Sequence, residues 1–297
     1  MGVLDEVQEA VAAVAASAGP SVVGIGSGGG RGSGIVLGEG TVLTNAHNLR
    51  GGEVTVVFPE GHSEVGTVKG VDIEGDLAVI AVGTGDAPAL AWSEAAVGLG
   101  TPVFALANRS GRGLRVTQGF VSSVGRAFRG PRGRTIAGTV EHTAPMAHGS
   151  SGGPIVDATG KLLGINTNRA GEGFYQALPA DEDLARRVAA LGRGEAPYRP
   201  RLGLGIIPGR MARRLRQAVG LPERDGLLVR EVEEGGAGAA AGLQQGDYIV
   251  AAAGKGLATV EDLQNAMEAL APGATLQLTV VRGAEERAVT LTLPDAG

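Results

Sequence analysis

The chain has 297 residues, which at about 100 to 200 residues per domain predicts two or three domains. Hydrophobic residues make up 43% and charged residues 19%, a balance typical of folded globular proteins and not of disordered ones. The net charge of -5 lacks the basic excess expected of a nucleic-acid-binding protein, and the absence of cysteine excludes disulfides, thiolate nucleophiles and cysteine-ligated metal sites. The 52 glycines and 14 prolines indicate many tight turns, which favours a mainly β fold.

The N-terminal segment, residues 1–17, is predicted to be a helical arm that packs on the rest of the chain. Apolar residues recur at helical spacing over residues 3–17, and Gly19-Pro20 ends the pattern. The segment carries acidic residues where a secretory signal would carry basic ones, and no apolar run reaches the about 18 to 20 residues of a membrane span. We therefore expect no membrane span in this chain, and the sequence leaves its compartment open.

Two β-rich modules of similar size follow, and together they form a predicted domain over residues 18–182. Short β-branched runs alternate with glycine-rich turns. In the first module the predicted strands include Ser21–Ile25, Gly34–Leu37, Val54–Phe58 and Leu77–Val82. In the second they include Val103–Leu106, Leu114–Val124, Arg134–Glu141, Lys161–Thr167 and Phe174–Leu178.

A linker is predicted over residues 183–200, before a smaller second domain over residues 201–297. Residues 181–191 have a helical pattern, and the segment 192–200 (GRGEAPYRP) has the glycine, proline and charge content of a linker. Beyond it, strands and helices alternate in a compact α/β pattern. The predicted elements are strands 202–207, 226–232, 248–252, 275–281 and 288–293, and helices 211–219 and 260–270.

The sharpest chemical signal is the run 149–154 (GSSGGP). A nucleophilic serine needs an exposed hydroxyl on a tight turn and backbone N–H groups that converge on the developing oxyanion. Glycines on both sides of Ser151 permit such a turn, and the amides of Gly149 and Ser151 would be the donors. By itself, such a run is equally consistent with an ordinary surface loop. The surrounding sequence is therefore needed to distinguish a catalytic serine turn from such a loop.

A base and an acid for this serine are found upstream. His47 follows an apolar run in the segment 44–47 (TNAH), and Asp76 opens a buried strand in the segment 75–80 (GDLAVI). A serine hydroxyl is a weak nucleophile near neutral pH, so it needs an imidazole base and a carboxylate that orients the imidazole. The order His47, Asp76, Ser151 is that of the chymotrypsin-like template.

Neighbouring residues are alternative candidates for the roles assigned to His47, Asp76 and Ser151. Asp72 precedes Asp76 by four residues, but only Asp76 abuts the apolar strand, and Ser150 is a turn residue beside the better-placed Ser151. His142 and His148 flank the serine run without carboxylates at ligand spacing, so we interpret them as loop residues and predict no metal site; His62 is a surface turn residue by the same reasoning.

The chain resembles the HtrA/Deg family, trypsin-like serine proteases that carry PDZ domains. The motifs that carry the resemblance are 20–25 (PSVVGI), 32–36 (GSGIV), 44–47 (TNAH), 76–79 (DLAV), 119–122 (GFVS), 151–154 (SGGP) and 164–166 (GIN). The resemblance implies a chymotrypsin-like double antiparallel β-barrel followed by a small α/β PDZ domain. It also implies His47 as base, Asp76 as orienting acid, Ser151 as nucleophile, the Gly149 and Ser151 amides as oxyanion hole, and no metal or organic cofactor.

The pocket beside Ser151 is predicted to accept small aliphatic side chains. The approach segment 143–147 and the return segment 165–167 contain no acid that could pair with a buried substrate cation, which argues against a trypsin-type preference. The residues expected to line the pocket are Met146, Ala147, Ile165 and Thr167.

The glycine-rich segment 202–206 (LGLGI) resembles the PDZ carboxylate-binding loop, with Leu204, Gly205 and Ile206 as the peptide-binding residues. The segment 242–249 (GLQQGDYI) resembles the later Gly-Leu-x-x-Gly-Asp-x-Ile motif of the family. The predicted helix 260–270 would form either the other wall of the groove or part of the core.

These features predict an ATP-independent serine endopeptidase that cleaves unfolded or misfolded proteins and whose PDZ domain binds peptide C-termini or exposed segments. The alternative is a catalytically silent, protease-shaped chaperone or peptide-binding protein, although all three triad residue types are present. The resemblance also implies a cell-envelope address and a homotrimer, although no aromatic residue precedes Phe58. The basic run 126–134 is interpreted as a solvated loop and not as a nucleic-acid patch.

Overall fold

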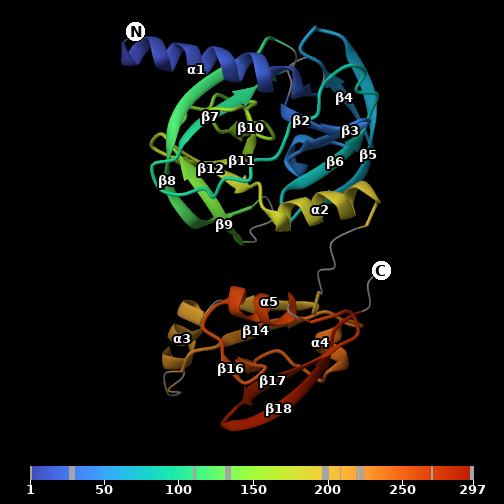
Figure 1. Ribbon diagram of the computed structural model, residues 1–297. Coiled ribbons are helices and arrows are strands. Elements are labelled where there is room, and N and C mark those ends of the chain that lie inside the picture. The colour runs from blue at the N-terminus through green and yellow to red at the C-terminus, as the bar shows by residue number, and fades with distance from the viewer. Residues whose placement is uncertain are drawn as a thin grey trace. The chain divides into compact units, whose positions relative to one another are not determined.

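The chain folds into two compact units, Met1–Pro197 and Tyr198–Gly297 (Figure 1). The computed structural model describes residues 2–26, 31–109, 112–130, 135–195, 201–207, 209–218, 220, 224–268 and 270–294. Over these residues, the N-terminal unit has two β-barrels and two long helices, and the C-terminal unit has one sheet with short helices.

The first barrel consists of six antiparallel strands. They are β1 (Val22–Ile25), β2 (Gly32–Gly38), β3 (Thr41–Thr44), β4 (Glu53–Val57), β5 (Ser63–Asp72) and β6 (Leu77–Ala81), closed in the order β1-β2-β3-β6-β5-β4. Strands β3 and β6 pair with Thr44 opposite Ala78. This register brings the residues that follow β3 next to the turn that precedes β6, where His47 and Asp76 lie.

The second barrel has the same arrangement. Its strands are β7 (Pro102–Ala107), β8 (Arg115–Arg129), β9 (Thr135–His142), β10 (Pro154–Val156), β11 (Leu162–Gly171) and β12 (Phe174–Pro179), closed in the order β10-β11-β12-β9-β8-β7. The turn with Ser151 connects β9 to β10. Two closed six-stranded barrels confirm the predicted chymotrypsin-like architecture. Of the basic run, residues 126–129 belong to β8, whereas residues 131–134 lie outside the described part of the chain.

The largest hydrophobic cluster of this unit draws on both barrels and both helices. It includes Leu43 and Leu77 from the first barrel, Leu106 and Ile165 from the second, and Val14 from the N-terminal helix. Burial of apolar surface is the main favourable term in folding. Because one cluster joins the two barrels, their relative placement within the unit is set by the core, and so is the distance between residues contributed by each barrel.

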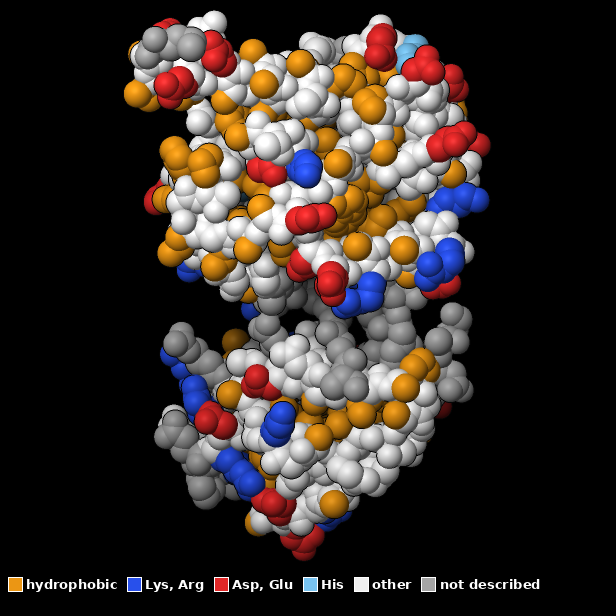
Figure 2. Space-filling view, viewed as in Figure 1, with side chains coloured by type: hydrophobic (Ala, Val, Ile, Leu, Met, Phe, Trp, Pro, Cys, Tyr) orange, Lys and Arg blue, Asp and Glu red, His pale blue; other side chains and the backbone are white. Residues whose placement is uncertain are grey.

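Helix α1 (Val3–Ala18) confirms the predicted N-terminal helix. Its C-terminal half is held by Val14 and Ala18, which are fully buried in the core. At the other end Val3 and Leu4 are 74% and 83% exposed, and hydrophobic and acidic side chains gather at this end of the helix (Figure 2). Packing on the core therefore holds only the second half of the helix.

Helix α2 (Glu182–Gly192) lies against β5 and β6 of the first barrel, and all of it except its first residue falls within the range 183–200 predicted to be a linker. Asp181 caps its N-terminus by accepting a hydrogen bond from the amide of Leu184 at 2.9 Å. Leu184 and Leu191 are buried in the core of the N-terminal unit. The helix is therefore a packed part of that unit. Residues 196–200 lie outside the described chain.

The described residues of the C-terminal unit form one antiparallel sheet and three helices. The strands are β13 (Leu204–Ile207), β14 (Leu227–Val232), β15 (Tyr248–Ala252), β16 (Lys255–Gly256), β17 (Thr275–Arg282) and β18 (Glu285–Thr292), and the helices are α3 (Gly209–Ala218), α4 (Ala237–Ala240) and α5 (Val260–Glu268). The sheet order is β13-β14-β15-β17-β18, with β16 paired to β15. Five strands and two helices of this unit were predicted, whereas the two-residue β16 and the one-turn α4 are too short to have a periodic sequence signal.

Candidate active site

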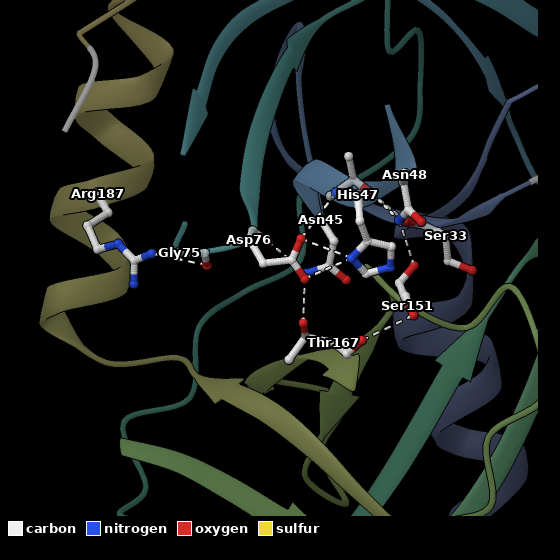
Figure 3. A network of polar contacts seen from close by, with 10 residues as sticks. Ser33, Asn45, His47, Asn48, Gly75, Asp76, Ser151, Thr167 and Arg187 are labelled. Carbon is white, nitrogen blue, oxygen red and sulfur yellow. Dashed lines mark hydrogen bonds and ion pairs between the residues drawn. The ribbon is translucent and has the colours of Figure 1, made fainter. Parts of the chain in front are cut away.

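His47 and Asp76 form a close pair in the first barrel (Figure 3). His47 lies in the short helix η2 (Ala46–Asn48), directly after β3, and Asp76 lies in the turn before β6. The imidazole Nδ1 is 2.8 Å from one carboxylate oxygen of Asp76 and 2.9 Å from the other. Asp76 is buried, whereas the His47 side chain is 35% exposed. A neutral imidazole that donates from Nδ1 to this carboxylate has a free lone pair on Nε2 and can act as a base there.

The Asp76 carboxylate has further donors that hold its orientation. The backbone amide of His47 donates to it at 3.1 Å, and the Thr167 hydroxyl donates to its other oxygen at 2.5 Å. The Asn45 side-chain amide donates to the backbone carbonyl of Asp76 at 2.9 Å. A buried carboxylate with several donors is compensated for its loss of water. The hydroxyl of Thr167, which the sequence placed only in the substrate pocket, thus belongs to this carboxylate's environment.

Ser151 comes from the second barrel and lies in the same polar network (Figure 3). Its hydroxyl donates to the backbone carbonyl of Thr167 at 3.3 Å. Within the described residues, no hydrogen bond joins this hydroxyl to His47. The structure therefore brings the three predicted residues together at the junction of the barrels, with the His47–Asp76 contact formed and the Ser151–His47 contact not formed.

Hydrogen bonds from the first barrel hold the backbone around Ser151. The amide of Ser33 donates to the Ser151 carbonyl at 2.8 Å, and the Asn48 side chain donates to the same oxygen at 3.0 Å. The Ser33 hydroxyl donates to the Gly149 carbonyl at 2.9 Å, and the Thr44 hydroxyl donates to the Ser33 carbonyl at 2.7 Å. The three bonds to the carbonyls of Ser151 and Gly149 join the two barrels and position the serine turn relative to His47, and the Thr44 bond holds Ser33 within the first barrel. Sequence reasoning did not assign this role to Ser33 and Asn48, although both lie within or beside quoted motifs.

The serine turn depends on glycine at two positions. Gly149 and Gly152 have φ angles of +87° and +86°, where side chains other than glycine are strained. A Cβ on Gly152 would lie 2.2 Å from the Ser33 carbonyl oxygen. Within the described residues, neither the amide of Gly149 nor that of Ser151 donates a hydrogen bond. Both amides are therefore available to a ligand.

The four predicted pocket residues lie in different surroundings. Met146 is buried, Ala147 is half-buried, and Thr167 is buried with its hydroxyl on Asp76. Ile165 is fully buried in the hydrophobic core of the unit, so its side chain has no exposed surface for a substrate to contact.

Arg169 adds a side chain to this region that sequence reasoning missed. Its guanidinium donates to the Met146 carbonyl at 2.7 Å and lies over the ring of Tyr175, 5.5 Å from the centroid. The contact with Tyr175 has the geometry of a cation–π interaction. Arg169 thereby ties β11 to the segment that approaches Ser151.

The three other histidines lie apart from the His47–Asp76 pair. The interpretation of His142 as a loop residue is wrong, since it ends strand β9 and is fully buried, with Nε2 2.9 Å from the Asn166 side-chain oxygen. His148 is exposed, and His62 is exposed and stacked on Phe58. Within the described chain, no group of three or more His, Cys, Asp or Glu side chains could hold a metal ion.

Burial lowers the pKa of His142 from 6.5 to about 4, because desolvation disfavours the imidazolium. The unfolded chain therefore takes up a proton below about pH 6.5, while the folded chain stays neutral until about pH 4. Stability is fully present above this window and falls as the pH decreases through it, by about 3 kcal/mol. Urea unfolding followed by the fluorescence of Trp92, the single tryptophan, reports on the N-terminal unit. The slope of unfolding free energy against pH should be shallower in His142→Gln than in the wild type, and an unchanged slope would contradict this assignment.

The predicted peptide-binding residues of the C-terminal unit lie in β13. Leu204, Gly205 and Ile206 are half-buried, and β13 pairs on one side with β14 and is the edge strand of the described sheet. Gly203, just before it, has a φ of +66°. On α5, Leu263 and Met267 are buried in the core of this unit, which favours the core alternative for these two residues.

Comparison with known proteins assigns both units to families. The trypsin-like peptidase domain matches residues 32–165, and the PDZ domain matches residues 203–293. The putative serine protease HhoA of Synechocystis is 31% identical over 284 residues, which cover 90% of this chain and 71% of HhoA. The chain belongs to the HtrA/Deg family of serine proteases.

Other relatives of this HtrA-family chain agree with that assignment. Serine endoprotease DegS of Escherichia coli is 28% identical over 89% of this chain and 76% of DegS. The putative serine protease HhoB of Synechocystis is 31% identical over 86% of this chain but only 64% of HhoB, so the chain spans less than two thirds of that relative. No helix in the described part of the chain is long and apolar enough to cross a bilayer.

Solved structures show the same fold over nearly the whole chain. The serine endoprotease from Yersinia pestis has a TM-score of 0.74 at 25% identity and covers 97% of this chain and 98% of its own. The HtrA-type protease AlgW with tripeptide has a TM-score of 0.72 at 27% identity, with 96% of each chain covered.

Proposed function

We propose that this HtrA-family chain is an ATP-independent serine endopeptidase that cleaves unfolded or misfolded polypeptides. The observation that carries the proposal is the His47–Asp76 contact of 2.8 Å, made in the same network as the Ser151 turn. A base that is oriented by a buried carboxylate and lies beside a glycine-flanked serine is the arrangement that acyl transfer requires. The names of the relatives, serine proteases and endoproteases, support the same reaction.

In this reaction Ser151 Oγ attacks the carbonyl carbon of the scissile peptide bond while Nε2 of His47 accepts the hydroxyl proton. Asp76 stabilises the imidazolium that forms, and the amides of Gly149 and Ser151 donate to the oxyanion. The imidazolium then protonates the leaving amine, and the acyl-enzyme remains on Ser151. Water, deprotonated by His47, attacks the ester and regenerates the serine.

The resting hydroxyl of Ser151 can leave its present hydrogen-bond partner by a local rotation. It donates to the carbonyl of Thr167, and rotation about the Cα–Cβ bond moves the oxygen between staggered positions without backbone movement. Catalytic hydrogen bonds are often long in substrate-free structures and shorten when substrate binds.

Small aliphatic substrate side chains suit the surroundings of Ser151. Met146 and Ala147 provide apolar surface, and neither segment 143–147 nor segment 165–167 carries an acid that could neutralise a buried substrate cation. In the described sheet β13 is an edge strand, and this edge suits a peptide that adds as a further strand, with Leu204, Gly205 and Ile206 along it. A homotrimer remains a prediction from the family.

Covalent labelling with a fluorophosphonate tests the proposal against the catalytically silent alternative. The probe phosphonylates a serine hydroxyl only where a base activates it, so mass spectrometry should find the adduct on Ser151 in the native protein, and casein should be degraded without ATP. The urea-unfolded protein is the control and should not be labelled. A native protein that binds casein but neither cleaves it nor reacts at Ser151 would favour the silent chaperone.

A further inference from the structure

An ion pair between the half-buried Arg187 and the buried Asp72 joins helix α2 to the turn that carries Asp76. The Nη2 atom of Arg187 donates to the Asp72 carboxylate at 2.9 Å. The same nitrogen donates to the Gly75 carbonyl at 3.2 Å (Figure 3). The side chains of Arg187 and Asp72 are only 25% and 1% exposed. Gly75 is the residue directly before Asp76, so the ion pair acts one peptide bond away from the proposed orienting acid.

Asp72 and Arg187 together define the turn over residues 72–76. The Asp72 carboxylate accepts a hydrogen bond from the Gly75 amide at 2.8 Å, and Arg187 binds the carbonyl of the same residue. Both backbone polar groups of Gly75 are therefore held by this pair. A Cβ on Gly75 would lie 2.0 Å from the guanidinium and 2.2 Å from the carboxylate, so the pair packs directly against its Cα.

Asp76 adopts a backbone conformation that needs such support. Its φ is +54°, in the left-handed region, which costs free energy for residues other than glycine and persists where the surroundings over-determine it. The Asn45 side chain holds the Asp76 carbonyl on one side, and the Asp72–Arg187 pair holds the preceding residue on the other. If the turn relaxed, the carboxylate would move away from His47.

Helix α2 presents Arg187 from a firmly packed position. Leu184 and Leu191, one turn before and one turn after Arg187, are 2% and 0% exposed in the core. Leu191 also packs against β5 so closely that a Cβ on Gly70 would lie 2.4 Å from the Leu191 carbonyl oxygen. The packing of Leu184 and Leu191, and not the ion pair, therefore sets the position of helix α2. The helix in turn places the Arg187 guanidinium next to the turn.

We infer that Arg187, paired with Asp72, is a positioning residue. It maintains the conformation of the turn over residues 72–76 and thereby keeps the Asp76 carboxylate in hydrogen-bond contact with His47. The inference rests on the proposed function, which assigns Asp76 to the triad. A purely structural role is the alternative, since a buried ion pair is by itself weak evidence for stability and for function. The two roles predict different measurements.

The test compares Arg187→Met with the wild type. Misplacing a catalytic group by about 1 Å can cost about 100-fold in rate, so we expect kcat for a peptide substrate to fall about 10- to 100-fold with KM little changed. The downfield 1H NMR signal of the proton between His47 Nδ1 and Asp76 should shift or disappear.

Arg187→Lys keeps the positive charge but replaces the planar guanidinium, with its several N–H donors, by one ammonium group. Its kcat should therefore lie between those of the wild type and Arg187→Met. Arg186→Gln, on the exposed side of the same helix, is the matched control and should behave as the wild type.

A second variant allows for misfolding of Arg187→Met, which removes the guanidinium from the buried Asp72 carboxylate. The double variant Asp72→Leu/Arg187→Met replaces both charges by apolar groups, which proteins often tolerate. It should unfold as cooperatively as the wild type by Trp92 fluorescence and still lose kcat and the NMR signal. A folded double variant with wild-type kcat and an unaltered signal would overturn the inference. The proposed function fails separately: if the wild type is neither active nor labelled at Ser151, the NMR comparison still tests whether Arg187 controls the His47–Asp76 contact.

Discussion

Replacing Ser151 with alanine should lower kcat for peptide hydrolysis on the order of a million-fold, to the residual rate that binding and the oxyanion donors provide. Alanine removes the only atom that can form the acyl-enzyme and leaves the turn intact, because the bonds from Ser33 and Asn48 go to the Ser151 carbonyl and not to its side chain. Steady-state cleavage of casein or of a quenched peptide provides the measurement, and Trp92 fluorescence shows that the protein is folded.

Ser150 is the matched control for this substitution. It is the adjacent serine in the same turn and is buried, whereas Ser151 is half-buried, and the Ser150 hydroxyl makes no hydrogen bond within the described chain. Ser150→Ala should therefore retain activity within a few fold. Substantial hydrolysis by a purified Ser151→Ala protein, or equal losses in both variants, would refute the assignment of Ser151 as nucleophile.

Asp76→Asn should lower kcat about 10,000-fold while the fold is retained. The carboxylate accepts hydrogen bonds from the His47 ring, the His47 amide and the Thr167 hydroxyl. An amide of the same shape presents an NH₂ group to one of these donors, so the imidazole is driven to the tautomer with its proton on Nε2. In that tautomer Nε2 cannot accept the proton of Ser151.

The decrease should reside in kcat, with KM for a peptide substrate changed little, because Asp76 does not contact substrate in the proposed mechanism. Asp86→Asn makes the same chemical change at an exposed carboxylate and should leave both constants unchanged. An Asp76→Asn variant that stays within tenfold of wild-type kcat would show that this carboxylate does not orient the base.

Much of the fold could be predicted because its sequence signals are local. The first-barrel strands β1 and β6 are continuous buried runs, and α1 has a clear helical period that ends at a Gly-Pro pair. Strand β5 is harder to recognise, because most of its residues are exposed or half-buried and its pairing with β6 is interrupted by a register shift. Its extent depends on its partners and not on its own composition.

The side chains missed or misplaced by the sequence have a common cause. Ser33 and Thr167 contact the Ser151 turn and Asp76 through hydrogen bonds that span 116 and 91 residues of sequence. His142 was interpreted as a loop residue because it flanks the serine run, yet it lies at the end of a strand and inside the barrel. Ile165 has the apolar character expected of a pocket wall, but the side of the strand that it faces places it in the core.

The sequence by itself determined the residue types that could do the chemistry, the two-part organisation and the mainly β character, because glycine-rich turns, strand-length apolar runs and short motifs are encoded by neighbouring residues. Only the tertiary structure decided how those residues meet: which carboxylate oxygen faces which donor, that the resting Ser151 hydroxyl bonds Thr167 and not His47, and that Arg187 supports the turn before Asp76. The physical reason is that these contacts join barrels and helices far apart in sequence, and their geometry is set by the packing of one shared core.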